Sequence, residues 1–170
     1  MFDTLAVIDT DADEATLVEG IAELEHLKSV AAAGQVRLTA ALDQKRRARE
    51  AAAGVPAAKR GRGLGSEIAL ARHDSPNCGG RHLGFARALV YEMPYTLAAL
   101  EAGALSEWRA TLIVRESACL SIEDRGTLDE RMCADQSELA GKGDKGHRSK
   151  GQSHCLRTGP AGRRGSCGAG

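Results

Sequence analysis

The sequence contains no apolar run that approaches the roughly 20 residues needed to cross a bilayer. Its N-terminus also lacks the basic start and the apolar stretch of a secretory signal peptide. These absences predict a soluble, cytoplasmic protein without a membrane partner. At 170 residues, the chain has room for one ordinary domain with an extension.

Paired cysteines are also missing. The number of cysteines is odd and no two of them form a C-x-x-C pair, so in a reducing compartment they are expected to be free thiols. Cys119 and Cys133 have apolar neighbours, which predicts that both lie in the core. The five cysteines are Cys78, Cys119, Cys133, Cys155 and Cys167.

The residue patterns of common active sites do not occur. There is no G-x-S-x-G nucleophile elbow and no G-x-x-x-x-G-K-[ST] phosphate loop. A structural zinc site needs four ligands, usually in two close pairs, and His147, His154, Cys155 and Cys167 do not supply them. We therefore expect no catalytic, metal or cofactor residues, no small-molecule ligand and no enzymatic activity.

Net charge is absent too, because 23 basic residues balance 23 acidic ones. The distribution is uneven: residues 1–27 hold eight acidic side chains and no Lys or Arg, whereas residues 45–62 hold seven basic ones and a single acid. Any electrostatic partner would therefore meet a segment of the chain and not the whole protein.

What the sequence does contain is helical periodicity. Asp13 to Ala53 is rich in strong helix formers, with Asp11 or Asp13 as the expected N-cap and Gly54 and Pro56 as the expected stop. Such a helix would be about 60 Å long at ~1.5 Å per residue, so it should either bend near Gly34 or pair with a second copy. Its apolar face is spaced at three, four and seven residues. The members of that face are Leu17, Ile21, Leu24, Leu27, Ala31, Leu38 and Leu42.

Shorter helices are expected to complete an all-α bundle, because no stretch alternates with the period of a strand. A basic, glycine-rich connector spans 54–65, and Ser66 should cap the next helix. Ser106 and Ser121 should cap the last two helices. Residues 73–82, HDSPNCGGRH, read as a loop, and Trp108 reads as a core anchor. The expected helices are 66–72, 83–93, 94–102, 107–119 and 121–133, and the expected divisions are an N-terminal arm over 1–12, a helical domain over 13–140 and a tail over 141–170.

The tail has one large aliphatic residue, Leu156. Ordering about 30 backbone residues costs on the order of 30–60 kcal/mol, whereas burying one leucine returns about 1.5–3 kcal/mol. We therefore expect residues 141–170 to be disordered.

A basic cluster is the one feature that favours nucleic acid, since it could neutralise several phosphates. Aromatic residues make up only 3% of the chain and none is interleaved with this cluster, so stacking on single strands is not indicated. The alternative is that cations near a helix C-terminus offset the helix dipole and keep a polar face solvated. The candidate nucleic-acid-binding residues are Lys45, Arg46, Arg47, Arg49, Lys59, Arg60 and Arg62.

Residues 96–114, TLAALEAGALSEWRATLIV, could form a helix-turn-helix with its turn at Gly103. Arg109 falls where that motif needs an apolar residue, and the apolar run 112–114 falls where base-reading polar residues belong. A plain helical hairpin is the favoured interpretation.

Three segments carry a resemblance: GRHLGFARAL (80–89), EMPYTLAAL (92–100) and GALSEWRATLIVRESACL (103–120). Together with the long first helix they make residues 15–145 resemble the N-terminal helical domain of the 13E12 repeat family. The resemblance implies a helical module that precedes an HNH endonuclease domain. The His base, metal ligands and C-x-x-C pairs of an HNH domain are missing here, so the chain resembles a truncated member.

The tail adds a genetic expectation. Reading from the second base of the codon for Gly146 allows the string GIEAKARATAYALDPRAVV, whose end resembles the family segment at this distance. We therefore expect the tail to be translated out of the family's frame, which the gene sequence tests. Two classes of function remain open. The first is an accessory DNA-binding module. The second is a protein-interaction or self-assembly module, or a gene relic without activity.

Overall fold

The fold is that of a computed structural model that describes residues 8–135 and 139. The described residues contain helices and no strand, which confirms the all-α prediction with a long first helix. The expected tail, 141–170, lies outside the described residues, as does most of the expected arm. The helices are α1 (Glu14–Ala52), the short 3-10 helix η2 (Ala57–Lys59), α2 (Leu64–Ala71), α3 (Pro76–Tyr91), α4 (Pro94–Glu101), α5 (Glu107–Glu116) and α6 (Ile122–Cys133).

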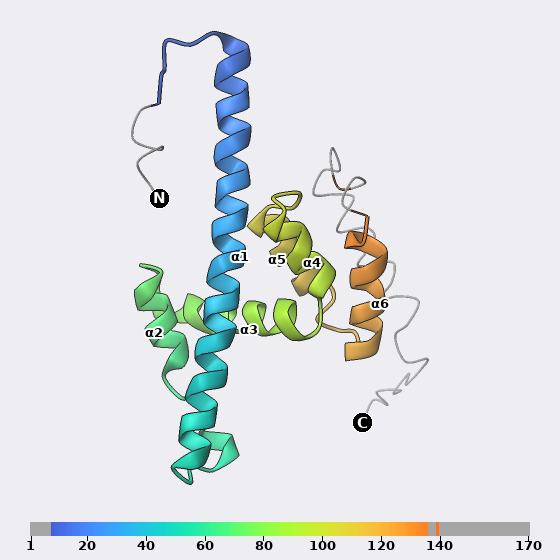
Figure 1. Ribbon diagram of the computed structural model, residues 1–170. Coiled ribbons are helices and arrows are strands. Elements are labelled where there is room, and N and C mark those ends of the chain that lie inside the picture. The colour runs from blue at the N-terminus through green and yellow to red at the C-terminus, as the bar shows by residue number, and fades with distance from the viewer. Residues whose placement is uncertain (1–7, 136–138, 140–170) are drawn as a thin grey trace, which may run out of the picture.

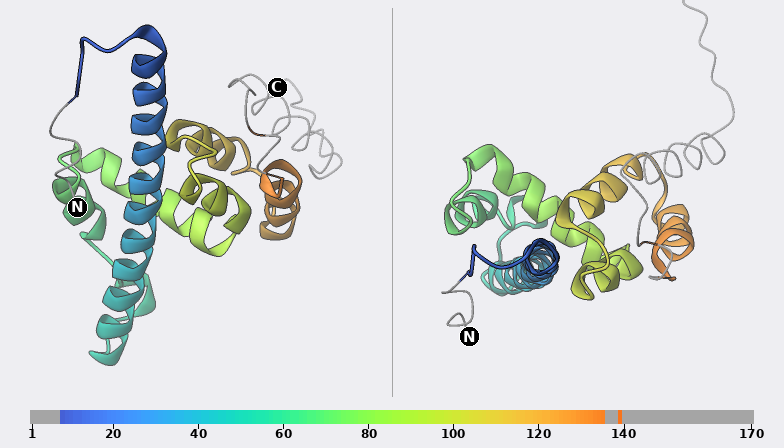
Figure 2. Two further views of the ribbon diagram at one scale, coloured as in Figure 1. Left: turned by 45° about the horizontal axis from the view of Figure 1, so that its top comes forward. Right: turned by 90° about the horizontal axis from the view of Figure 1, so that it is seen from above.

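Helix α1 is a single element of 39 residues, about 58 Å long at ~1.5 Å per residue. It continues through Gly34 as one uninterrupted α-helix. Figure 1 shows α1 crossing α3, with α2 on one side of it and α4, α5 and α6 on the other. The N-terminal half of α1 extends beyond the other helices (Figures 1 and 2).

Side-chain caps fix three of the helix starts, as the sequence predicts. The carboxylate of Asp13 accepts a hydrogen bond of 3.0 Å from the backbone N–H of Thr16 at the start of α1. Ser106 and Ser121 accept in the same way at the starts of α5 and α6. Each cap satisfies a backbone donor that the helix itself leaves without an acceptor.

Two expectations around α2 and α3 are wrong. The segment 73–82 is not a loop throughout, because α3 begins at Pro76, and proline is well suited to a first helical turn. Likewise α2 begins at Leu64 after Gly63, so Ser66 is not its cap. The glycines of this region serve a close helix crossing: a Cβ on Gly79 would lie 1.8 Å from the carbonyl oxygen of Gly65.

The main core lies where α1, α3, α4, α5 and α6 meet. Helix α1 contributes small side chains to it, which allow α3 and α4 to approach closely. The other helices supply the larger residues, with Leu89, Met93 and Leu100 fully buried. The members from α1 are Ala32, Ala33, Val36 and Ala40.

The predicted apolar face of α1 is therefore not the buried one. Its six large members are exposed, and Ala31 is exposed as well. We call these six residues the outer stripe: Leu17, Ile21, Leu24, Leu27, Leu38 and Leu42.

Trp108 and Cys119 also differ from expectation. The side chain of Trp108 is 54% exposed and is not a core anchor. Cys133 is buried, as predicted, whereas Cys119 is exposed and disulfide-bonded. No helix within the described ranges is long and apolar enough to span a bilayer.

A candidate nucleic-acid interface and the outer stripe of α1

The seven predicted nucleic-acid-binding residues lie close along the chain, on the last turns of α1 and on the connector that follows it. Four of them are exposed and three are half-buried. The exposed ones are Lys45, Arg49, Lys59 and Arg62, and the half-buried ones are Arg46, Arg47 and Arg60.

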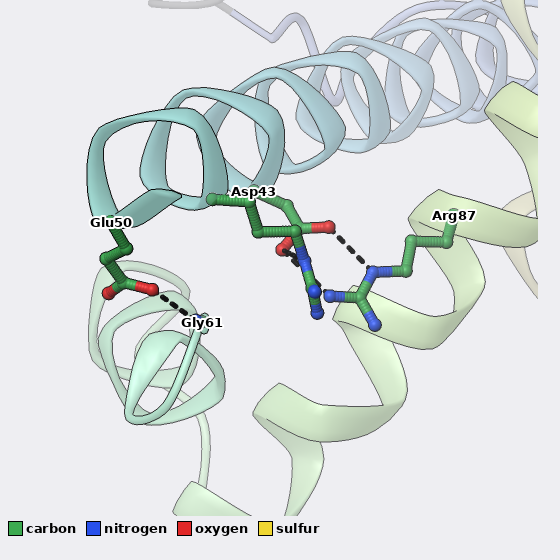
Figure 3. Close-up of polar contacts among 5 residues, drawn as sticks. Asp43, Glu50, Gly61 and Arg87 are labelled. Carbon is green, nitrogen blue, oxygen red and sulfur yellow. Dashed lines mark hydrogen bonds and ion pairs between the residues drawn. The ribbon is translucent and has the colours of Figure 1, made fainter. Parts of the chain in front are cut away.

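The three half-buried residues all have partners within the chain. Arg47 donates from Nε to the buried carboxylate of Asp43 at 2.8 Å. Arg87 on α3 donates to the same carboxylate from Nε at 2.7 Å and from Nη2 at 2.8 Å. Figure 3 shows Asp43 of α1 and Arg87 of α3 pointing toward each other. The hydrogen bond from Arg87 is the largest effect that holds the pKa of Asp43 below its ordinary value.

Arg46 connects α1 to α2. Its two terminal nitrogens donate to the two oxygens of Glu67 at 3.1 Å and 2.7 Å. This two-bond geometry is the strong form of an arginine–carboxylate pair, and it holds the pKa of Glu67 below its ordinary value. A phosphate that approached Arg46 would have to displace Glu67.

The connector is tied back to α1 and to itself. Arg60 donates from Nε to the carbonyl oxygen of Val55 at 2.8 Å. The backbone N–H of Gly61, which has a φ of 74°, donates to Glu50 at 2.6 Å (Figure 3). The connector, which the sequence describes only as basic and rich in glycine, is therefore held by one hydrogen bond to α1 and one within itself.

Four of the seven residues keep their charge available. The side chains of these four, Lys45, Arg49, Lys59 and Arg62, make no hydrogen bond or ion pair with the described part of the chain. Their cationic groups are therefore the part of the predicted cluster that can contact phosphate without first breaking an internal pair.

The segment tested as a helix-turn-helix is built into the core. On α5, Leu112 and Ile113 are buried, so the face that would have to read bases is occupied. The start of α4 is held by Asp129 of α6, which accepts hydrogen bonds of 2.8 Å from the backbone N–H groups of Tyr95 and Thr96. Burial is the largest effect on Asp129 and raises its pKa.

A third polar cluster, at the start of α3, has no counterpart among the sequence predictions. Nε2 of His82 lies 3.0 Å from Oδ2 of Asp74, and this contact is the main reason that the pKa of Asp74 falls to about 2. The hydroxyl of Ser75 donates to the sulfur of Cys78 at 3.2 Å. Within residues 8–135 and 139, no group of three or more His, Cys, Asp or Glu side chains is placed to hold a metal ion.

The outer stripe of α1 is the second candidate surface. Every residue from Asp13 to Lys28 is exposed except the half-buried Gly20. The stripe continues past this segment to Leu38 and Leu42, and Lys45 and Arg49 follow on the same helix. Two further large aliphatic residues of α1, Val18 and Val30, are exposed as well.

Sequence reasoning found the positions of both surfaces but missed the internal partners of the arginines. Asp43 and Glu67 were recognisable as possible partners, since each is an acidic residue close in sequence to the basic segment 45–62. Nothing in the sequence indicated which acid would fold onto which arginine, because Asp43 and Arg87 are 44 residues apart. Comparisons with protein-family models, curated proteins and solved structures find no match to this chain.

Proposed function

We propose that this protein is a protein-interaction module that binds a partner helix through the outer stripe of α1. The observation that carries the proposal is the exposure of the six large aliphatic side chains of the stripe on one continuous helix. Large apolar side chains that gather exposed on one side of a helix mark interaction sites in soluble proteins. We propose no catalytic role for the described residues.

The first turns of α1 strengthen the proposal. An isolated helix shorter than about 12–15 residues is marginal in water, and most helical stability in proteins comes from packing an apolar face. Residues 14–28 are a helical segment of about this length at the start of α1. Their large aliphatic side chains are exposed, so no packing within the chain stabilises this segment. Full burial of one leucine is worth about 1.5–3 kcal/mol, so a partner helix along the stripe would stabilise this half of α1 substantially.

Site-specific photocrosslinking in cells tests the proposal. A photoreactive residue at Leu24, in the stripe, should yield crosslinked protein, whereas the same residue at Glu19, exposed on another face of α1, should not. Equal crosslinking from both positions, or none from Leu24, would remove the proposal. The mass of the product shows whether the partner is another copy or a different protein.

Duplex DNA is the second candidate partner, because four exposed cations gather at the end of α1 and on its connector. Four phosphate contacts predict a log–log salt slope of about −3.6, at roughly −0.9 per contact. Replacing all four cations with alanine should abolish binding to random duplex DNA in an anisotropy titration. Replacing the exposed Arg81 and Arg131 instead should leave the slope unchanged.

We also propose, on the three sequence segments quoted above, that the chain is a relative of the 13E12 repeat family. The codons downstream of residue 146 test the frameshift part of that proposal. A gene that offers no continuation in a shifted frame would leave the tail as the native one.

A further inference from the structure

We propose that the partner of the outer stripe is a second copy of this chain, bound antiparallel so that the two α1 helices run side by side. The inference rests on the proposed function of the stripe and adds to it the partner, the orientation and the register. Two lines of observation carry it: the spacing of the stripe and the distribution of charge along α1.

The spacing comes first. The sequence positions 17, 21, 24, 28, 31, 35, 38 and 42 alternate steps of four and three, which is the spacing of a coiled-coil seam. All eight positions are exposed. Five of them are members of the outer stripe, Ala31 is a sixth apolar position, and Lys28 and Gln35 are polar. At 100° per residue, the mean direction of the seam lies about 110° around the helix from that of the residues buried against the bundle. The seam therefore lies on the side of the helix, outside the face that packs against the protein's own core.

An antiparallel pair of such seams is self-complementary. If the two ends of the stripe overlap fully, Leu17 of one copy faces Leu42 of the other, and Ile21 faces Leu38. Each contact then occurs twice, related by a two-fold axis near the middle of the paired segments, as a symmetric dimer requires.

Charge decides between the two orientations. The first half of α1 and the residues just before it are acidic, whereas the seam beyond Leu42 continues with Lys45 and Arg49. In the antiparallel register, Lys45 faces Glu14 of the other copy, so opposite charges meet at both ends of the dimer. In a parallel pair each acidic end would face its own copy, which is unfavourable.

The dimer also accounts for the two available cations on α1, Lys45 and Arg49. Arg46 and Arg47 turn away to Glu67 and Asp43, and both are bound within the chain. Lys45 and Arg49 lie on the seam and are exposed, which is where a facing acidic helix would need them. A helix complements α1 when its acidic end faces Lys45 and Arg49 and its basic end faces Glu14. A second copy of α1 in the antiparallel orientation meets this condition.

Sedimentation velocity of the full chain, across the micromolar range and with a reductant present, tests the proposal. The unmodified chain should shift from monomer to dimer as its concentration rises. Leu38→Glu should prevent the shift, because it places a carboxylate in the apolar seam. Leu70→Glu is the matched control, since Leu70 on α2 is 79% exposed and Leu38 is 73% exposed, but Leu70 lies off the seam.

A charge swap tests the orientation. Lys45→Glu should weaken the dimer about tenfold, since two pairs are lost per dimer, and adding Glu14→Lys should restore it. A parallel dimer would not recover in the double variant, and that outcome would overturn the antiparallel orientation.

The outcomes separate this inference from the proposed function. A monomer at every concentration, combined with crosslinks from Leu24 to a different protein, would overturn the dimer and leave the interaction surface in place. A monomer without crosslinks would remove both. A dimer that survives Leu38→Glu would show that another surface holds the two copies, and it would overturn the inference.

Discussion

Adding one methyl group at Gly79 should destabilise the protein, whereas adding it one residue later should stabilise it. A Cβ at Gly79 would lie 1.8 Å from the carbonyl oxygen and 2.6 Å from the carbonyl carbon of Gly65, and 3.0 Å from Cβ of Ala69. The first two atoms are backbone, so no side-chain rotation can relieve the overlap, and α2 must move away from α3. A Cβ at Gly80 would meet nothing within 4 Å.

The magnitudes follow from two opposing effects. Alanine is favoured over glycine inside a helix by about 1 kcal/mol, and this gain applies at both positions. Overpacking typically costs about 1–3 kcal/mol, and a clash with backbone belongs at the upper end or beyond. Gly79→Ala should therefore lower the free energy of unfolding by about 2 kcal/mol, and Gly80→Ala should raise it by up to ~1 kcal/mol.

Urea unfolding followed by circular dichroism at a fixed protein concentration measures both variants. A difference of about 3 kcal/mol between them corresponds to a change of roughly a hundredfold in the unfolding equilibrium constant. If Gly79→Ala proves as stable as Gly80→Ala, the close crossing of α2 over α3 is not present in solution.

Three further predictions concern buried carboxylates and the single tryptophan. The pKa of Asp43 is lowered in the folded state, so its contribution to stability is present above the ordinary value of 3.8 and is lost as the pH falls through the folded pKa. Asp43→Asn should therefore reduce the loss of stability in acid, measured by unfolding at a series of pH values. An unchanged pH profile would argue against the pair with Arg87. The pKa of Asp129 is raised by burial, so its effect has the opposite sign: stability falls as the pH rises from 3.8 through the folded pKa. Asp129→Ala should nevertheless lower the free energy of unfolding by about 2–3 kcal/mol, because it leaves the N–H groups at the start of α4 without acceptors, and a loss under ~1 kcal/mol in urea titrations would show that water replaces the carboxylate. Trp108, the only tryptophan, should be quenched by acrylamide in the native state nearly as readily as after unfolding, and strong protection of its fluorescence would contradict its exposed position.

Local signals in the sequence were sufficient for most helix boundaries. Asp13, Ser106 and Ser121 cap where they were expected to, because a side-chain oxygen next to a helix start acts within three residues. The start of α3 was missed because a Pro–Gly-rich segment also fits a turn. Only the position of Gly65 across the crossing explains why Gly79 belongs in a helix.

The buried face of α1 could not be predicted from periodicity. The large aliphatic residues define the most regular stripe, yet the core selects Ala33, Val36 and Ala40, which let the neighbouring helices approach. Sequence spacing shows that a face exists, whereas its partner depends on where the remaining helices pack. The same limit applied to the basic cluster, since the pairing of Arg46 with Glu67 is set by the tertiary fold.

The central claim is that a second copy of this chain covers the outer stripe of α1, and hydrogen exchange of the backbone amides of residues 14–28 tests it most directly. In a monomer these amides belong to an exposed helix half with little packing to hold it closed, and they should exchange rapidly. We predict that their exchange slows by about tenfold or more between dilute and concentrated solutions of the unmodified chain, and that Leu38→Glu removes the effect. Exchange of this segment that is equally fast at every concentration would contradict the claim that a second copy covers the stripe.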